Sequence, residues 1–152
     1  MGADGAGGGR EPGCVFCSIV AGEAEASFVA REDRVCAFMD IRPVTDGHLL
    51  IVPDSHVESL ADMDAEDAAQ MFALGIRLAT AARATVPCDG VNLFLADGEA
   101  AGQEVDHVHL HVIPRTPGDG FLVDAEAWSR PPPTREHLDA IAARIREGME
   151  QG

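Results

Sequence analysis

The stretch His107-Val108-His109-Leu110-His111-Val112-Ile113 places a histidine at every second position. Successive side chains of a β-strand point to opposite faces, so the three imidazoles would share one face at intervals of roughly 6.6–7 Å. The apolar residues between them would point the other way and could bury in a core. The alternation therefore predicts a strand with an apolar back and an exposed imidazole front.

A row of imidazoles on one face indicates a chemical role. Imidazole readily gains or loses a proton near neutral pH, and it can act as a nucleophile, a general acid or base, or a metal ligand. A plain core strand is the weaker interpretation, because three buried imidazoles would need three polar partners. We therefore expect catalysis or metal binding at this strand.

Length and composition indicate a single domain with a sizeable core, because the chain has 152 residues and 46% of them are hydrophobic. We expect a flexible Gly-rich leader at residues 1–13 and a single domain at residues 14–152, of which residues 116–152 are a C-terminal extension. The net charge is −15, and all 11 basic residues are arginines. Such a chain repels phosphate backbones, so nucleic acid is not an expected partner, whereas a small anionic substrate remains possible.

The N-terminus lacks the apolar segment of a secretory signal, and no apolar run reaches the length of a membrane span. We therefore expect a cytoplasmic protein that does not contact a membrane. In a reducing compartment the four cysteines are expected to be thiols or metal ligands rather than disulfides. Cys36 and Cys88 are interpreted as small buried apolar residues, and His137 is expected to face solvent.

Short apolar runs and turn signals predict the remaining elements. They are, in chain order, a hairpin of residues 27–31 and 34–40, a strand at 48–53, a main helix at 64–84 capped by Asp64, a strand at 91–95, and a final helix after Thr134. In the main helix, the apolar residues near helical spacing are Ala68, Met71, Phe72, Ile76 and Ala79. The short links favour an α+β fold: an antiparallel sheet of about five strands, one main helix packed on it, and a C-terminal helix.

The histidine stretch resembles the His-x-His-x-His-x-x signature, with x apolar, of the histidine triad (HIT) superfamily. Other segments resemble that family in the same order: Cys14-Val-Phe-Cys17, Phe38-Met-Asp-Ile-Arg-Pro-Val44, Gly47-His48-Leu-Leu-Ile-Val-Pro-Asp-Ser-His56, Gly98-Glu-Ala-Ala-Gly-Gln103 and Pro114-Arg115. The resemblance covers roughly residues 14–115 and is nearest to bacterial proteins of the histidine triad nucleotide-binding branch.

The resemblance implies a nucleotide hydrolase that acts at an α-phosphorus and releases a nucleoside monophosphate. His109 would be the nucleophile and form a transient nucleotidyl-histidine. His111 would contact the phosphate and protonate or orient the leaving group. His48 would lie across from His111, and would help to fix the tautomer of the nucleophile or bind phosphate. The substrate would be a phosphoramidate, an acyl-adenylate or a dinucleoside polyphosphate.

The resemblance also implies a nucleoside pocket. Asp40 would accept hydrogen bonds from the ribose hydroxyls, which suits a carboxylate facing a diol. Ile41, Phe38 and Phe16 would enclose the base with apolar surface. An ordinary core position remains the alternative for each of these three, and a solvated carboxylate remains the alternative for Asp40.

The phosphate loop implied by the resemblance spans residues 98–103. Gly102 and Gln103 would supply backbone N–H groups to the phosphate, and Gly98 would allow close approach. The chain departs from the family pattern at Ala96-Asp97, where relatives often have two asparagines, and at Asp106, where an aromatic or apolar residue is common. We expect these departures to affect substrate choice and rate.

Cys14 and Cys17 alone are a weak metal signal, because Cys-x-x-Cys can also be redox-active or incidental. His56 and His107 strengthen it, since two cysteines and two histidines make a closed tetrahedral zinc site. Relatives with this Cys-x-x-Cys, including the galactose-phosphate uridylyltransferases, bind zinc with the equivalent four groups. His107 would then be a structural ligand rather than a free base. Reduced, unliganded cysteines are the alternative.

Two other functions remain open. One is a nucleotide-binding, zinc-stabilised scaffold with weak catalysis, which the replacement at Ala96 favours. The other is a nucleotidyltransferase or phosphorylase, which a histidine rather than glutamine at position 111 disfavours. The resemblance further implies a homodimer in which one sheet extends across both subunits.

Overall fold

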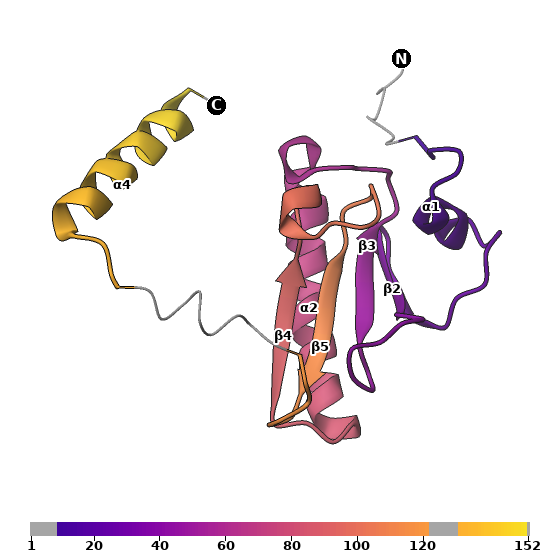
Figure 1. Ribbon diagram of the computed structural model, residues 1–152. Helices are drawn as coiled ribbons and strands as arrows, with labels where there is room; N and C mark the ends of the chain where they lie inside the picture. Colours follow the sequence, from indigo (N-terminus) through magenta and orange to yellow (C-terminus); the bar gives the residue numbers. More distant parts are fainter. Residues whose placement is uncertain (1–8, 122–130, 152) are drawn as a thin grey trace, which may run out of the picture. The chain divides into compact units, whose positions relative to one another are not determined.

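The computed structural model describes residues 9–121 and 131–151, so the predicted leader at residues 1–13 lies mostly outside the described part. The chain divides into two compact units, residues 1–119 and 120–152. The first unit contains the sheet and every residue predicted for the site (Figure 1). The second contains the C-terminal helix.

A five-stranded antiparallel sheet forms the centre of the first unit. Its strands are β1 (Phe28–Arg31), β2 (Val35–Met39), β3 (Leu49–Pro53), β4 (Gly90–Leu95) and β5 (Leu110–Arg115), in the order β1-β2-β3-β5-β4. The helical elements of this unit are α1 (Val15–Val20), η1 (Leu60–Asp62), α2 (Ala65–Thr85) and η2 (Glu99–Ala101). The predicted α+β fold, with its hairpin and its main helix, is confirmed.

The long helix α2 begins where the sequence indicates. The Asp64 side chain accepts hydrogen bonds from the backbone N–H groups of Glu66 and Asp67, which a helix start otherwise leaves without partners. The helix runs along one face of the sheet, behind β4 and β5 in the view of Figure 1. At Gly75 it approaches so closely that an added Cβ would lie 3.3 Å from the Leu110 side chain.

The buried face of α2 differs from the apolar positions that we read in the sequence. Met71, Leu74 and Leu78 enter the core, whereas Phe72 and Ile76 are 56% and 53% exposed. The face that meets the sheet follows the i, i+3, i+7 positions from Met71, and Phe72 and Ile76 fall outside it. Two large apolar side chains therefore lie on the outer surface of the helix.

The sheet is covered on both faces, which explains its apolar strands. The cluster beneath α2 includes Val35, Ala37, Leu49, Ile51, Val108, Leu110 and Val112. The cluster on the opposite face joins α1 to β2 and β3 through Phe16, Ile19, Cys36, Phe38, Leu50 and Val52. All five residues of β3 are therefore buried. Cys36 is buried as expected, whereas Cys88 is only partly buried.

The histidine stretch keeps the predicted alternation but not the predicted exposure. Val108, Leu110 and Val112 all enter the core beneath α2, although the strand begins only at Leu110. The expectation of an exposed imidazole front is wrong, because His107 and His109 are 0% and 5% exposed. Phe16 of α1 covers their rings, with centroids 5.8 and 5.1 Å away.

The second unit contains the predicted C-terminal helix, α4 (Arg135–Glu150). The Thr134 side chain caps it by accepting a hydrogen bond from the N–H of His137, and His137 is exposed as expected. Leu138, Ile145 and Met149 are exposed on this helix. Among the described residues, no helix has the length and apolar character needed to cross a membrane.

Candidate active site

A cleft of about 280 Å³ lies beside α1 and the histidine stretch. Its lining includes residues predicted for catalysis and substrate binding: Phe16, Phe38, Asp40, Ile41, His109 and His111. Sequence reasoning missed other lining residues, among them Glu25, Arg42, Glu104 and Val105. Glu104 and Val105 directly follow the predicted phosphate loop, and that position is the one sequence signal that could have identified them.

His109 is held in a single tautomer by the backbone. Its Nδ1 lies 2.7 Å from the carbonyl oxygen of His107. A carbonyl oxygen only accepts, so Nδ1 carries a proton, and in the neutral ring Nε2 keeps its lone pair. The carbonyl of His107, rather than His48, therefore sets the tautomer of the predicted nucleophile. The result is an unprotonated Nε2 on a ring that lines the cleft.

His48 instead acts on His111. The backbone N–H of Val44 donates to His48 Nδ1 at 3.0 Å, so the neutral His48 ring carries its proton on Nε2. That Nε2 lies 2.9 Å from His111 Nδ1 and donates to it. His111 must then carry its own proton on Nε2. The chain of hydrogen bonds from Val44 through His48 leaves His111 as a neutral donor beside His109, at a ring-centroid separation of 4.9 Å.

Burial keeps both of these rings neutral. It is the main cause that lowers the pKa of His111 to about 4; the neighbours His109 and His48 act in the same direction, and Asp40 opposes them. Burial also lowers the pKa of His48, again against the opposing charge of Asp40. The hydrogen bonds from Val44 through His48 to His111 require that both rings are neutral. Because burial keeps both rings neutral, these hydrogen bonds persist at neutral pH.

Asp40 and the apolar residues Phe16, Phe38 and Ile41 line the cleft together with His109 and His111. Asp40 Oδ1 accepts from the Arg42 N–H at 2.8 Å, and Oδ2 lies 3.5 Å from His48 Nε2. Phe16 and Phe38 pack edge to face at 5.6 Å, and they both line the cleft and belong to the buried cluster. Ile41 is 89% exposed at the cleft.

Backbone N–H groups of the predicted phosphate loop donate to carbonyls within the same loop. Gly98 and Gly102 take positive φ values of 92° and 95°, which suits glycine. The N–H of Gln103 donates to the Gly98 carbonyl at 3.1 Å, and that of Gly102 donates to the Glu99 carbonyl at 2.9 Å. Gly98, Gly102 and Gln103 do not line the cleft. The N–H groups of Gly102 and Gln103 would have to leave their present carbonyl partners before they could bind a phosphate.

Two polar side chains near this loop have structural partners. The Gln103 side chain accepts from the Gly98 N–H at 2.7 Å and donates to the carbonyls of Glu58 and Val105 at 2.9 Å. Asp97 Oδ1 accepts from the Leu60 N–H at 3.0 Å. The carboxylate that replaces a family asparagine is thus used to hold η1.

Cys14, Cys17, His56 and His107 come together beside the cleft, as predicted. His107 Nδ1 lies 3.4 Å from Cys14 Sγ and 3.7 Å from Cys17 Sγ, and His56 Nδ1 lies 3.4 Å from Cys17 Sγ. In tetrahedral zinc sites, bond lengths near 2.3 Å to sulfur and 2.0–2.1 Å to nitrogen separate the two ligand atoms by about 3.6 Å. The spacing therefore fits zinc.

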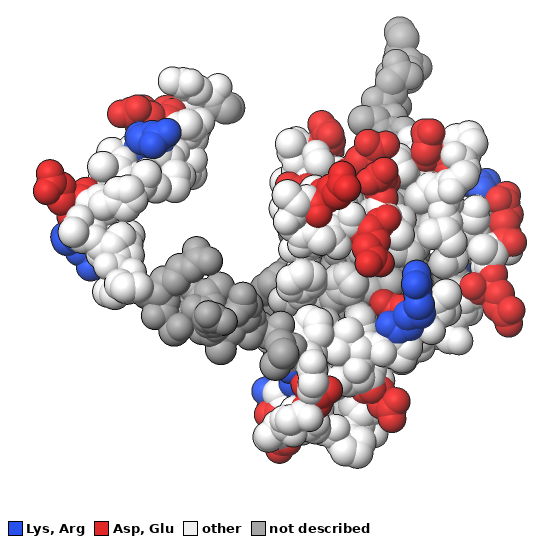
Figure 2. All heavy atoms as spheres, viewed as in Figure 1, with Lys and Arg blue, Asp and Glu red and all other residues white. Residues whose placement is uncertain are grey.

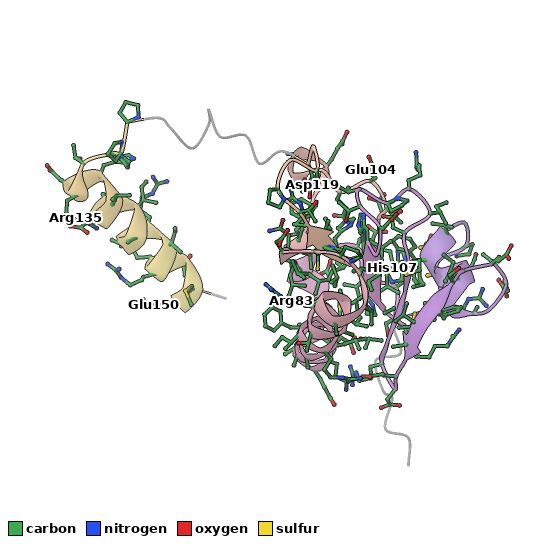
Figure 3. The ribbon with its side chains drawn as sticks, turned by 90° about the horizontal axis from the view of Figure 1, so that it is seen from below. Arg83, Glu104, His107, Asp119, Arg135 and Glu150 are labelled. Atoms are coloured by element: carbon green, nitrogen blue, oxygen red, sulfur yellow. The ribbon has the colours of Figure 1, made fainter. Side chains whose placement is uncertain are left out.

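The outer hydrogen bonds of this group also suit a metal. His107 Nε2 donates to the Pro53 carbonyl at 2.9 Å, which leaves the Nδ1 lone pair directed at the thiols. His56 Nε2 lies 3.4 Å from Glu58 Oε1, an acceptor that favours the tautomer with its proton on Nε2. Figure 3 shows the labelled His107 in the interior of the first unit and Glu104 at its margin.

A second group, Asp40, His48 and His111, has similar spacing, with ligand atoms within 4.8 Å of one another. Its hydrogen bonds argue against a metal site at these three residues. His48 Nδ1 already accepts from Val44, so Nε2 could bind a metal only if the neutral ring lost its one N–H proton or gave up this bond. We therefore interpret the second group as a hydrogen-bonded relay.

Comparisons with known proteins identify the family of this chain. The HIT domain family model matches residues 21–118. An uncharacterized HIT-like protein of Mycobacterium tuberculosis (strain ATCC 25618 / H37Rv) is 44% identical over 138 residues, which are 91% of this chain and 94% of the relative. The structure of a zinc-bound histidine triad family protein from Mycobacterium smegmatis is 40% identical, with a TM-score of 0.69, and covers 90% of this chain and 97% of that one. A histidine triad nucleotide-binding protein from Candida albicans is 25% identical, with a TM-score of 0.80 and coverage of 91% and 98%. The chain therefore belongs to the HIT domain family.

Proposed function

We propose that this protein hydrolyses nucleotides at the α-phosphorus through a covalent nucleotidyl-histidine and releases a nucleoside monophosphate. The observation that carries the proposal is the hydrogen bond from His109 Nδ1 to the His107 carbonyl, which selects the tautomer whose Nε2 has a free lone pair on a ring that lines the cleft. Membership of the HIT family supports a nucleotide-binding or hydrolase-like function in general.

The reaction would run in two displacements. In the first, His109 Nε2 attacks the α-phosphorus, a P–N bond forms, and the bond to the leaving group breaks. His111, protonated on Nε2, donates a hydrogen bond to the departing atom, which takes its proton from solvent water, so the His111 ring stays neutral. In the second, water attacks the same phosphorus and loses a proton to solvent, while the P–N bond breaks. The monophosphate leaves and the starting protonation state returns.

The cleft would hold the nucleoside half of the substrate. The ionised Asp40 would accept from the ribose hydroxyls, while Phe16, Phe38 and Ile41 would contact the base. The substrate would be a phosphoramidate, an acyl-adenylate or a dinucleoside polyphosphate. Nucleic acid is not a proposed partner: Figure 2 shows carboxylates over the visible face of the first unit with few arginines among them, in keeping with the net charge of −15.

Zinc is the proposed cofactor, held by Cys14, Cys17, His56 and His107. When bound, it supplies a fixed structural anchor rather than a reacting group, because four protein ligands close the site. His107 thereby links the metal centre to catalysis, since its carbonyl orients His109. None of the four cysteines, all of which lie in the described residues, forms a disulfide, and a reducing, cytoplasmic setting is the proposed location.

A homodimer is the proposed assembly. β4 is the last strand of the sheet, and a second copy placed beside it could extend the sheet. Phe94 on β4 and Phe72 and Ile76 on α2 are large apolar side chains exposed on these two elements. They offer the apolar surface that a stable interface between copies needs.

The test is hydrolysis of a panel of adenosine and guanosine phosphoramidates, an acyl-adenylate and dinucleoside polyphosphates, with release of monophosphate as the readout. We expect His109→Ala to lower the rate by about 10³-fold or more. His137→Ala, which removes an exposed histidine of α4, is the matched control. Rapid quenching should trap nucleotide covalently attached to His109.

Three results would decide against this function. Full hydrolytic activity in His109→Ala would show that another group is the nucleophile. Nucleotide binding without release of monophosphate from any substrate would favour a zinc-stabilised binding scaffold. Transfer of the nucleotidyl group to phosphate or a sugar phosphate in preference to water would favour a phosphorylase or transferase.

A further inference from the structure

The loop between β2 and β3 is fastened to β5 by one side chain. Thr45 Oγ1 donates a hydrogen bond to the carbonyl of Pro114 at 2.6 Å. The carbonyl of Thr45 also accepts from the His48 N–H at 3.1 Å, which closes a four-residue turn. Thr45 thus connects the turn that carries His48 to the strand that carries His111.

Gly47 makes this turn possible. Its φ of 90° suits the third position of a turn that requires a positive φ, and an added Cβ would lie 3.1 Å from the Pro114 side chain. Two features therefore press the turn against the same proline: the close approach of Gly47 and the hydrogen bond of Thr45. The adjacent backbone has little freedom to move.

The position of this turn determines which backbone atom contacts the His48 ring. Val44, the residue before Thr45, directs its N–H at His48 Nδ1 over 3.0 Å. This backbone donor fixes the tautomer of His48, and His48 Nε2 fixes that of His111 over 2.9 Å. The Val44 side chain takes no part in this hydrogen bond, so the sequence gives no sign of the role of its backbone N–H.

We propose that Thr45 is a positioning residue, which holds the Val44 N–H on His48 and so keeps His111 protonated on the nitrogen that serves the leaving group. The catalytic part of this inference rests on the proposed hydrolase function. The tautomer part concerns the free protein and stands without it.

The nucleophile and the group that serves the leaving group then depend on different contacts. The His107 carbonyl sets the tautomer of His109 independently of Thr45. Loss of the Thr45 hydroxyl should therefore weaken the hydrogen bond from His111 to the leaving group and leave the nucleophile unchanged. Reactions whose leaving group departs without a proton should not respond.

The experiment compares Thr45→Val, Thr45→Ser and Thr85→Val. Valine removes the hydroxyl at nearly constant shape, and serine restores it. Thr85→Val removes a hydroxyl that donates to the Ala81 carbonyl at 2.7 Å, at the far end of α2, and is the matched control. Thermal unfolding checks that each variant is folded.

The first readout is the ¹⁵N chemical shift of the imidazole nitrogens of the free protein. Wild type, Thr45→Ser and Thr85→Val should show His48 and His111 each protonated on Nε2 alone. Thr45→Val should show mixed tautomers at both rings, with the ratio shifted about fivefold, the change expected from loss of one ordinary hydrogen bond. Unchanged shifts for both rings in a folded Thr45→Val would overturn the inference.

The second readout is kcat on two substrates with the same nucleoside. On an alkylamine phosphoramidate, whose nitrogen must be protonated to leave, Thr45→Val should lower kcat in proportion to the fraction of His111 that loses its Nε2 proton, with little change in KM. On the p-nitrophenyl ester of the monophosphate, kcat should not change. An equal loss on both substrates would overturn the catalytic part, whereas inactivity of the wild type towards every substrate would remove the proposed function and leave the ¹⁵N result standing.

Discussion

The carbonyl oxygen of His107 accepts the Nδ1 proton of His109 at 2.7 Å, while the ring of His107 faces Cys14 and Cys17. One residue therefore contributes its side chain to the metal group and its backbone to the nucleophile. Phe16 packs against both imidazole rings and belongs to the helix that begins between the two cysteines. A disturbance of the metal group should consequently reach the reacting nitrogen.

We predict about one equivalent of zinc per chain in protein purified without chelators, by elemental analysis. Cys17→Ala should reduce this to less than about a tenth of an equivalent, lower the melting temperature and slow hydrolysis. Cys88→Ala is the control, because this partly buried thiol is not in the metal group. His48→Ala should retain the full equivalent, because its ring is a relay. Two equivalents in the wild type, or fewer than a tenth, would contradict the assignment.

We predict that Asp40→Asn weakens recognition of ribose. The carboxylate accepts from two hydroxyls, whereas an amide presents one accepting oxygen, so KM for a ribonucleotide substrate should rise about tenfold. KM for the 2′,3′-dideoxy analogue should stay the same, since it lacks both hydroxyls. Asp46→Asn, at an exposed carboxylate of the same loop, is the control. A parallel rise in KM for both substrates would indicate loop damage instead, because Asp40 Oδ1 also accepts from the Arg42 N–H.

Local patterns predicted much of the fold. The Asp64 cap, the hairpin and the alternation of Val108 with its neighbours depend on residues close in the chain, and each was found where the sequence indicates. The outward position of Phe72 and Ile76 was not predicted, because helical spacing alone does not say which of two apolar stripes meets the sheet.

The side chains of the site could be predicted from the sequence, whereas the backbone groups that orient them could not. The residue types of the metal group and the cleft carry their chemistry in the sequence, and resemblance to a family placed them together. The donor on His48 is a Val44 amide, and the acceptor on His109 is a His107 carbonyl. Every residue has these groups, so their use depends on the fold. The burial of His109 likewise required Phe16, which lies far away in the chain.

We predict that a single polar substitution on α2 separates the proposed dimer. Ile76→Asp places a charge on an exposed apolar position next to Phe72, so it should yield monomers at micromolar concentration with the fold retained. Light scattering at several concentrations measures the change. Val29→Asp, at an exposed apolar position of β1 on the opposite edge of the sheet, should leave the dimer intact. A monomeric wild type, or separation by Val29→Asp alone, would refute the proposed interface.

We predict that His111 makes the protein less stable in mild acid. Burial lowers its pKa in the folded state to about 4, from an ordinary value of 6.5. Between these values the unfolded chain binds more protons than the folded chain, so the free energy of unfolding rises with pH. The contribution is complete above about pH 6.5 and is lost as the pH falls towards 4.

The groups that face the ring are His109, His48 and Asp40, and only Asp40 favours the protonated form. His111→Asn removes this titration, so its melting temperature should fall less steeply between pH 7 and pH 4.5 than that of the wild type. His137→Asn, at an exposed site, should follow the wild-type curve. Because loss of metal in acid would affect all three proteins alike, the decisive quantity is the difference in slope. Equal slopes for His111→Asn and the wild type would mean that the folded protein binds a proton at His111 as readily as the unfolded chain does.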